Sequence, residues 1–155
     1  MRYDIFNVIE ALHKTILYAM YCQYMAFFFM QYIFKIQGET PAKKNSRITL
    51  PNGRTIPSKK YREWHEIAAV QILAQKGSQR LSEALQRVLR LEVMFYHGDM
   101  RKRDCDNGLS SICDLLVDCG VLADDNWKIV RDVIVSNAYD KNNARAIVII
   151  KDIDN

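Results

Sequence analysis

Alternating apolar and polar positions predict strands at two places in the chain. In residues 31–37, the apolar set that begins with Tyr32 faces one way, and the set that includes Lys35 and Gln37 faces the other. In residues 87–96, leucine, valine and phenylalanine alternate with arginine, glutamate, methionine and tyrosine. Because successive side chains of a strand point to opposite faces, both segments are expected to bury one face.

Apolar positions spaced three and four residues apart predict two helices. Ser58 can cap the first helix, which is expected to run to about Lys76 and to end at Gly77. The second follows Asn107 and ends at Gly120, and its apolar stripe has the i, i+3, i+4, i+7, i+8 pattern of an amphipathic helix. The stripe consists of Leu109, Ile112, Cys113, Leu116 and Val117.

Two more strands are expected near the C-terminus. They are KIVRDVIV, beginning at Lys128, and ARAIVIIK, residues 144–151, with a polar loop from Ser136 to Asn143 between them. The resulting order is strand, helix, strand, helix and two strands. It predicts an α+β fold, in which two main helices pack on a small mixed β-sheet. A length of 155 residues allows one domain of ordinary size.

The stretch from Ile16 to Phe34 contains no charged residue and has about the length of a membrane span. Glutamines and tyrosines interrupt it, and strand-like alternation begins inside it, so a membrane location is not favoured. Three interpretations remain: an extra helix on the domain, a membrane or partner anchor, or sequence translated from upstream of a natural start at Met30. We expect an apolar extension over residues 1–29 and one functional domain over residues 30–155.

The net charge of +4 comes from the chain beyond residue 29, and many of its cations gather between Lys35 and Arg62, where Glu39 is the single acid. Prolines and an Asn-Gly pair punctuate this segment, which predicts a long loop or an irregular hairpin. It is either a footprint for a polyanion such as nucleic acid or a solvated loop. The candidates for contacts with DNA phosphates are Lys43, Lys44, Arg47, Arg54, Lys59 and Lys60.

The spacing of cysteines and histidines offers no metal site. The four cysteines form no CxxC pair and have no histidine at a zinc-like separation, so we expect reduced thiols in a cytoplasmic protein. Cys113 and Cys119 are expected to fill the core. The histidines His13, His65 and His97 lack a spaced partner and are assigned no role.

The segment RKRDCDN, residues 101–107, places two aspartates directly after three cations. In an extended segment Asp104 and Asp106 would point to the same side, where two carboxylates can share one hard cation. Magnesium takes oxygen ligands and often completes its shell with water or substrate phosphate, which suits phosphodiester chemistry. A helix beginning at Asn107 would also favour an anion nearby.

Two interpretations of this run compete. It is a good capping and turn sequence, and Asp104 and Asp106 would then be structural. The cations Arg101, Lys102 and Arg103 favour a nuclease instead, because a nuclease needs cations for the DNA backbone beside acids for the metal.

A second acidic pair, Asp124 and Asp125, lies in a predicted turn after the second helix. A helix of about 12 residues would carry the chain roughly 18 Å away from the first pair. Only a fold that doubles back, or a partner subunit, could then bring Asp125 to the same metal. The pair can also be a simple turn.

Taken together, RKRDCDN, a helix, CGVLADDNWKIV and a late hairpin strand resemble the RusA family of Holliday junction resolvases. The resemblance covers roughly residues 31–152, and GETPAKKNSR after the first strand is similar to the start of that family's domain. It implies an α+β nuclease that acts as a homodimer and nicks four-way DNA junctions symmetrically with Mg²⁺ and no small-molecule cofactor. The family's catalytic and metal-binding aspartates would fall on Asp104, Asp106 and Asp125, with Asp124 beside them. A bacterial or phage origin and a cytoplasmic location are also implied.

One position departs from the family pattern, and it leaves two functions open. The family commonly has a lysine four positions after the second aspartate, where this chain has Ser110. Such a lysine could stabilise the phosphate transition state or the leaving oxygen, so its absence bears on turnover more than on metal binding. The chain is therefore expected to be either an active junction endonuclease or a weakened or inactive junction-binding protein. A membrane-associated interaction protein is the third alternative.

Overall fold

The computed structural model describes residues 13–18, 20, 31–43 and 46–153. Contacts divide the chain into two compact units, and the unit Gln31–Ile153 contains every strand and helix discussed below. In the other unit, the described residues are helical. Among the described residues, no helix is long and apolar enough to cross a membrane. Residues 21–30 lie outside the described part, so the boundary at residue 30 and the role of the N-terminal stretch stay predictions.

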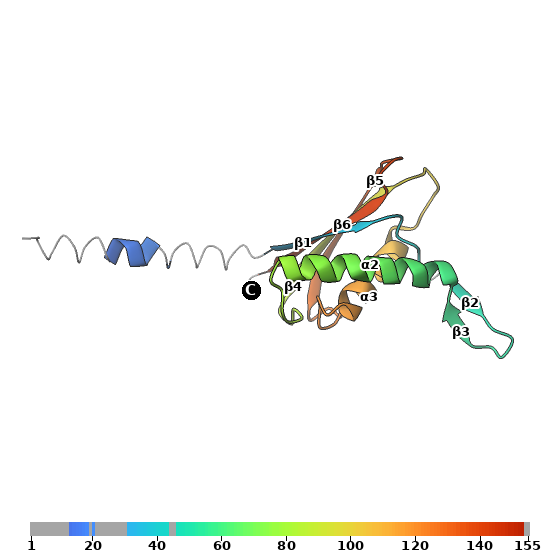
Figure 1. Cartoon of the computed structure of the whole chain (residues 1–155), viewed down its shortest axis with the longest axis horizontal. Helices are drawn as coiled ribbons and strands as arrows, with labels where there is room; N and C mark the ends of the chain where they lie inside the picture. Colours follow the sequence, from blue (N-terminus) through green and yellow to red (C-terminus); the bar gives the residue numbers. More distant parts are fainter. Residues whose placement is uncertain (1–12, 19, 21–30, 44–45, 154–155) are drawn as a thin grey trace, which may run out of the picture. The chain divides into compact units, whose positions relative to one another are not determined.

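One mixed sheet organises the larger unit (Figure 1). Its strand order is β1-β6-β4-β5, in which β6 is antiparallel to both β1 and β4, and β4 is parallel to β5. The strands are β1 (Gln31–Gln37), β4 (Leu89–His97), β5 (Val130–Tyr139) and β6 (Arg145–Asp152). The predicted α+β class is confirmed.

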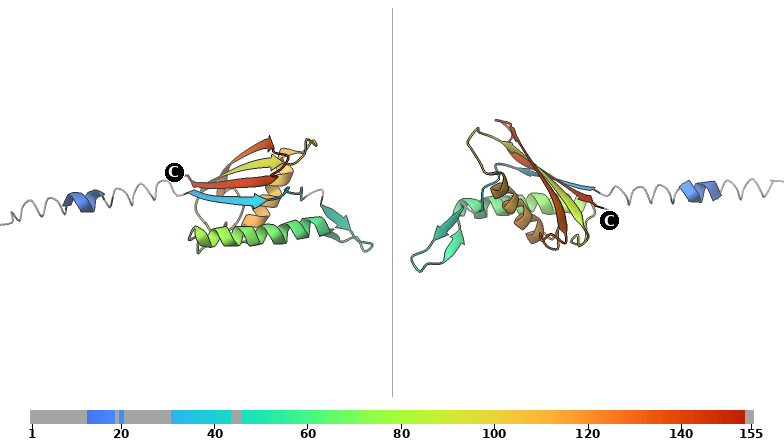
Figure 2. Two further views of the ribbon diagram at one scale, coloured as in Figure 1. Left: turned by 45° about the horizontal axis from the view of Figure 1, so that its top comes forward. Right: turned by 180° about the vertical axis from the view of Figure 1, so that it is seen from behind.

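The helices α2 (Lys59–Ser78) and α3 (Cys105–Asp118) pack on one face of this sheet (Figure 2). In β1 the side chains alternate between buried and exposed, as predicted, because one face meets the helices. Phe34, Leu91 and Val148 from the sheet are almost fully buried together with Ile72 from α2 and Leu116 from α3. The predicted core thiols Cys113 and Cys119 are buried and free.

The strand β5 is longer than predicted. The polar loop expected from Ser136 to Asn143 is wrong at its start, because β5 runs on to Tyr139. Parallel pairing with β4 continues to the pair His97 and Tyr139, and this pairing outweighs the polar local sequence. The strand consequently carries Asn137 to the end of β4.

The basic segment forms a small hairpin, as predicted for its turn residues. Its strands β2 (Arg47–Thr49) and β3 (Thr55–Pro57) make a separate two-stranded sheet at the start of α2 (Figure 1). The backbone N–H of Ser58 donates to the carbonyl of Ser46 at 2.7 Å and closes the base of the hairpin. The Ser58 hydroxyl then accepts from the N–H of Tyr61 at 3.2 Å and caps α2, as predicted.

The outer edge of β1 is covered by glutamine side chains from α2. Gln79 pairs with the peptide group of Ile33, accepting from its N–H at 2.9 Å and donating to its carbonyl at 2.8 Å. Gln75 makes the same pair with Lys35, at 2.7 Å and 2.8 Å, and Gln71 accepts from the N–H of Gln37 at 2.7 Å. We call Gln71, Gln75 and Gln79 the glutamine ladder.

The spacing of the glutamine ladder follows from the geometry of its two elements. Four residues of an α-helix rise about 6 Å, and two residues of a strand rise about 6.6 Å. Glutamines at every fourth helix position therefore meet every second residue of the antiparallel strand. An exposed strand edge is an aggregation hazard, and the ladder occupies the free hydrogen-bonding groups of β1.

Candidate functional site

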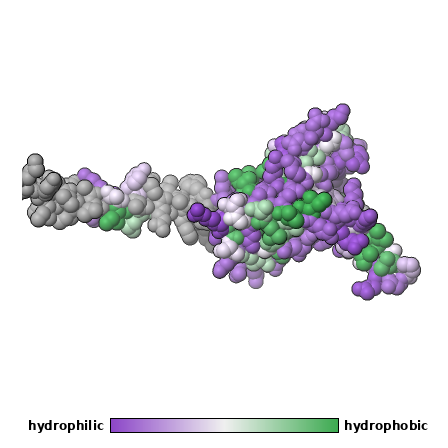
Figure 3. Space-filling model, viewed as in Figure 1, coloured by the Kyte–Doolittle hydropathy of each residue, from purple (hydrophilic) through white to green (hydrophobic). Residues whose placement is uncertain are grey.

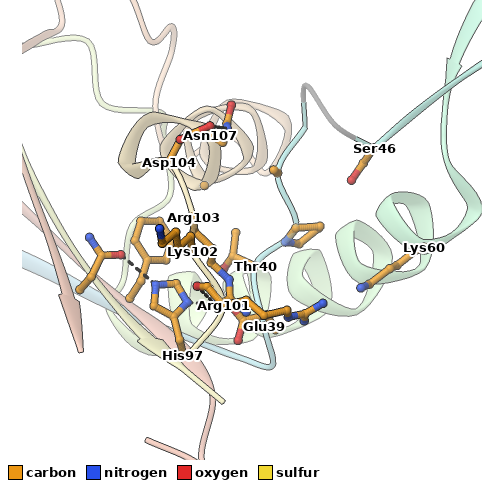
Figure 4. A pocket seen from close by; sticks show the side chains of 15 residues that line it. Glu39, Thr40, Ser46, Lys60, His97, Arg101, Lys102, Arg103, Asp104 and Asn107 are labelled. Atoms are coloured by element: carbon orange, nitrogen blue, oxygen red, sulfur yellow. Dashed lines mark hydrogen bonds and ion pairs between the residues drawn. The ribbon is translucent and has the colours of Figure 1, made fainter. Parts of the chain in front are cut away.

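A pocket of about 720 Å³ opens where several segments of the larger unit meet. It is lined by residues 39–42 after β1, by the end of β4, by the basic run before α3 and by the first turn of α3 (Figure 4). Ser46 and Lys60, at the base of the hairpin, and Asn137 of β5 complete the lining. The strands β1 and β4 both run antiparallel to β6, so their C-terminal ends lie at the same end of the sheet.

Asp104 lines this pocket and is the N-cap of α3. Its backbone has the extended conformation of an N-cap, with φ −80° and ψ 133°. The side-chain amide of Asn107 donates to Asp104 Oδ2 at 3.0 Å, and Asn107 itself is 8 % exposed. A buried neighbour thus orients the exposed carboxylate of Asp104.

The predicted extended segment through Asp106 is wrong, because α3 begins at Cys105 and not after Asn107. An aspartate at the N-cap and another in the first turn both favour an early helix start, since the N-terminus of a helix attracts negative charge. Asp106 is exposed in that first turn. Both carboxylates of the predicted pair therefore belong to the N-terminal end of α3.

The helical start separates the two carboxylates, because side chains two positions apart on a helix do not face each other, and only Asp104 of the pair lines the pocket. Magnesium often binds through one or two carboxylates and takes its other oxygens from water and substrate phosphate. Asp104 and Asp106 are both exposed and within one helical turn of each other. Among the described residues, no group of three or more His, Cys, Asp or Glu side chains could hold a metal ion.

In the second acidic pair, Asp124 and Asp125 have different surroundings. Asp124 organises its own turn, accepting from the N–H of Asp125 at 2.7 Å and from the side-chain amide of Asn126 at 2.7 Å. The Asn126 amide and then the Asp125 N–H lower the pKa of Asp124.

Asp125 acts electrostatically on Cys113, a residue in the second half of α3. Burial, and then the negative charge of Asp125, raise the pKa of Cys113 to about 11. Cys113 follows Asp106 by two helical turns, or roughly 10 Å of rise. Within the described part of the chain, Asp125 therefore does not join Asp104 and Asp106 in one ligand group.

The cations of the basic run differ in their partners. Arg103 is largely engaged inside the protein: its guanidinium donates to Asp99 Oδ1 at 2.8 Å and to the carbonyl of Arg101 at 3.0 Å. Arg101 is 74 % exposed and pairs with Asp99 at 2.7 Å. The Arg101 guanidinium holds the pKa of Asp99 well below its usual range. Lys102 is exposed.

Other predicted DNA-binding cations surround the hairpin. Arg47 and Arg54 are exposed on it, and Lys60 lines the pocket. Lys59 is exposed and lies 3.6 Å from Glu63, whereas Lys43 pairs with Asp114 of α3. Lys44 lies outside the described residues.

His97 and Glu39 line the pocket and had no predicted role. His97 Nδ1 is 2.7 Å from Glu39 Oε1, and His97 Nε2 is 2.8 Å from Asn137 Oδ1. A separation of 58 residues divides His97 from Glu39, so no local motif links them. One signal could have found them: Glu39 follows β1 and His97 ends β4, and the C-terminal ends of these two strands lie at the same end of the sheet.

A family model described as Endodeoxyribonuclease RusA matches residues 38–151. The chain belongs to the RusA family of endodeoxyribonucleases. The match covers the pocket, both acidic pairs and the basic hairpin of this RusA-family protein, so the resemblance seen in the sequence is confirmed. Membership makes the protein a nuclease whose substrate is DNA. A comparison with curated proteins gives no match.

The position of Ser110 in this RusA-family chain can now be stated. It lies one helical turn after Asp106 on α3 and is half-buried. Residues four apart on a helix are neighbours on its surface. A lysine at this position would therefore stand beside Asp106.

Proposed function

We propose that this protein is a Mg²⁺-dependent, structure-specific endodeoxyribonuclease that resolves four-way DNA junctions by paired symmetric nicks in recombination and repair. The observation that carries the proposal is the position of Asp104 and Asp106. Both lie at the N-terminal end of α3 within the RusA-family domain, and Asp104 lines a pocket that cations also line. A nuclease that acts on chromosomal or phage DNA is expected in the cytoplasm of a bacterial cell.

The residues of the chain divide the chemistry between them. Asp104 and Asp106 would hold Mg²⁺, which supplies a Lewis acid for the scissile phosphate and lowers the pKa of bound water. Asn107 fixes the orientation of Asp104. Lys60 and Lys102 carry positive charge beside the pocket, where they can contact neighbouring phosphates. The N-terminus of α3 adds a favourable partial charge for the phosphate.

A homodimer would suit this substrate, because a four-way junction has two equivalent strands and a two-fold assembly can present one site to each. Exposed apolar side chains over α2 support such an assembly (Figure 3). Ile67, Val70 and Leu73 are 62 %, 69 % and 53 % exposed. Patches of this kind often mark protein contacts. If sedimentation equilibrium gave a protein–junction complex whose mass corresponds to one protein chain, the dimer would be excluded.

A dimer also bears on the third aspartate. Asp125 could join the metal by movement of its loop or could serve the site of a second subunit. Mixing inactive Asp106→Asn and Asp125→Asn chains distinguishes these routes. Recovered cleavage supports a site shared between subunits, and no recovery supports a site built within one chain.

The direct test of the function is cleavage of a synthetic mobile four-way junction in Mg²⁺, with a linear duplex of the same sequence as control. We expect paired nicks at symmetric positions in the junction and none in the duplex. Tight junction binding without nicks in either Mg²⁺ or Mn²⁺ would overturn the proposed activity.

The second candidate function is a junction-binding protein with weak or no cleavage. Ser110 favours it, because this position beside Asp106 lacks the lysine common in the family. The Ser110→Lys variant separates the two candidates. Cleavage that appears only in the variant supports the binding protein, whereas cleavage by the wild type makes the lysine dispensable.

The hairpin is expected to contact the DNA backbone. Replacing the exposed Arg54 by glutamine should weaken binding to junction and duplex alike and lower the slope of log K against log salt by about 1. Fluorescence anisotropy over a series of salt concentrations measures both quantities.

The matched control for this prediction is Arg80→Gln. Arg80 is also exposed but follows α2 at the end opposite the hairpin. Equal salt slopes for wild type and Arg54→Gln would remove Arg54 from the DNA interface.

A further inference from the structure

The carboxylate of Glu39 joins three segments at the bottom of the pocket (Figure 4). Glu39 follows β1 directly after Gly38, whose φ of +95° turns the chain toward β4. Its Oε1 lies 2.7 Å from His97 Nδ1 and 3.3 Å from Arg103 Nε. Its Oε2 accepts the backbone N–H of Gly98 at 3.1 Å.

These contacts are strong ones for a side chain at a pocket wall. The side chain of Glu39 is 28 % exposed, and those of its partners His97 and Arg103 are 17 % and 24 % exposed. Partial burial lowers the local dielectric, and hydrogen bonds that involve an ionised group are stronger than neutral ones. Both carboxylate oxygens are already occupied, so Glu39 is poorly placed to bind a metal ion itself.

Arg103 connects this cluster to the nuclease site, because it directly precedes Asp104. Residues 98–104 contain no helix or strand, so side-chain contacts must fix their path. Glu39 and Asp99 together hold the Arg103 guanidinium from two directions, at 3.3 Å and 2.8 Å. The position of Asp104 therefore depends on Glu39, a residue that follows a different strand, β1, at the same end of the sheet.

We propose that Glu39 is a positioning residue of the nuclease site. It fixes Arg103 and the Gly98–Arg103 connection, and it thereby sets where the Asp104 carboxylate stands at the start of α3. The effect on catalysis rests on the proposed function, whereas the effect on the connection does not.

The test variant is Glu39→Gln in the full chain. Glutamine keeps the size of the side chain and can accept the Gly98 N–H, but it has no charge for Arg103 and turns an N–H toward a donor. We expect kcat for junction cleavage to fall about tenfold or more, while KM changes less than about threefold, because misplacement of a catalytic group affects the chemical step.

The matched control is Glu92→Gln. Glu92 is a strand residue with a similar exposed fraction, 24 %, and it pairs with Lys151 at 2.8 Å, away from the pocket. Its substitution removes an ion pair of the same kind and is expected to leave kcat within about twofold of wild type. Equal kcat values for Glu39→Gln and wild type would overturn the proposal.

Limited proteolysis gives a readout that needs no nuclease activity. Trypsin cuts after arginine and lysine, so the run Arg101 to Arg103 reports directly on the connection. We expect Glu39→Gln to raise cleavage in this run severalfold, and Glu92→Gln to leave it unchanged, with fragments identified by mass spectrometry. A rise spread evenly over all tryptic sites would mean a general loss of stability and would also overturn the proposal.

Two outcomes keep the tests separate. If the wild type never cuts junctions, the proposed function fails, while the trypsin comparison still decides the role of Glu39. If Glu39→Gln does not fold, Glu39→Asp replaces it. Aspartate keeps the charge on a shorter side chain, and we expect intermediate kcat and intermediate trypsin cleavage; wild-type values for both would overturn the proposal.

Discussion

Asparagine in place of Asp106 is expected to lower the single-turnover rate of junction cleavage in Mg²⁺ by roughly a thousandfold, equivalent to about 4 kcal/mol. The carboxylate is exposed in the first turn of α3, two positions after Asp104. Asparagine keeps the size of the side chain but removes the negative charge that a magnesium ion requires. The measurement is the cleavage rate of an end-labelled mobile junction with enzyme in excess.

The control for this prediction is Asp118→Asn at the other end of α3. Asp118 is 61 % exposed and lies 3.0 Å from His65, far along the helix from the first turn. Its substitution should leave the cleavage rate within about threefold, since it contacts neither Asp104 nor the pocket. Both variants should bind the junction in Ca²⁺ as the wild type does. A wild-type rate for Asp106→Asn would falsify the assignment of Asp106 as a metal ligand.

The Ser111→Ala substitution is expected to lower the free energy of unfolding by about 2–4 kcal/mol. Ser111 is fully buried on α3, and its hydroxyl donates to the carbonyl of Pro41 at 2.6 Å. The same hydroxyl accepts the backbone N–H of Lys43 at 3.1 Å. Alanine would leave two backbone groups without their partner, and an unsatisfied buried group costs about 1–3 kcal/mol. Urea denaturation measures the change.

Ser110→Ala is the neighbouring control. Ser110 is half-buried, and its substitution should change the free energy of unfolding by no more than about 0.5 kcal/mol. Equal losses for the two variants would show that the Ser111 hydroxyl does not hold the segment after β1. Because that segment lines the pocket, Ser111→Ala is also expected to reduce junction cleavage more than Ser110→Ala does.

Local periodicity predicted most elements of this fold but not their arrangement. The alternation in β1 and the capping serine of α2 act within a few residues, so both were visible in the sequence. The insertion of β6 between β1 and β4 was not, because each strand shows the same apolar face whatever its neighbour. The extension of β5 to Tyr139 depends on pairing with β4, which its own polar residues do not indicate.

The candidate site shows the same division. Asp104, Asp106 and the basic run are adjacent in the sequence, so their type and spacing were enough to predict chemistry there. Glu39, which holds Arg103, follows β1, and its own partner His97 ends β4, far away in the sequence. The split between an exposed Lys102 and an engaged Arg103 depends on those partners, and charge counting treats the two residues alike.

The glutamine ladder restricts which residues evolution can accept at three surface positions of α2. Solvent-facing helix positions usually accept many residue types, but Gln75 and Gln79 must each offer both a donor and an acceptor at the length of one side chain, and Gln71 must offer an acceptor. Glutamate or lysine in place of Gln75 or Gln79 would supply only half of that pair. A lineage that loses one rung must protect the edge of β1 by other means, such as a proline or an edge lysine, so substitutions in α2 and β1 are expected to occur together.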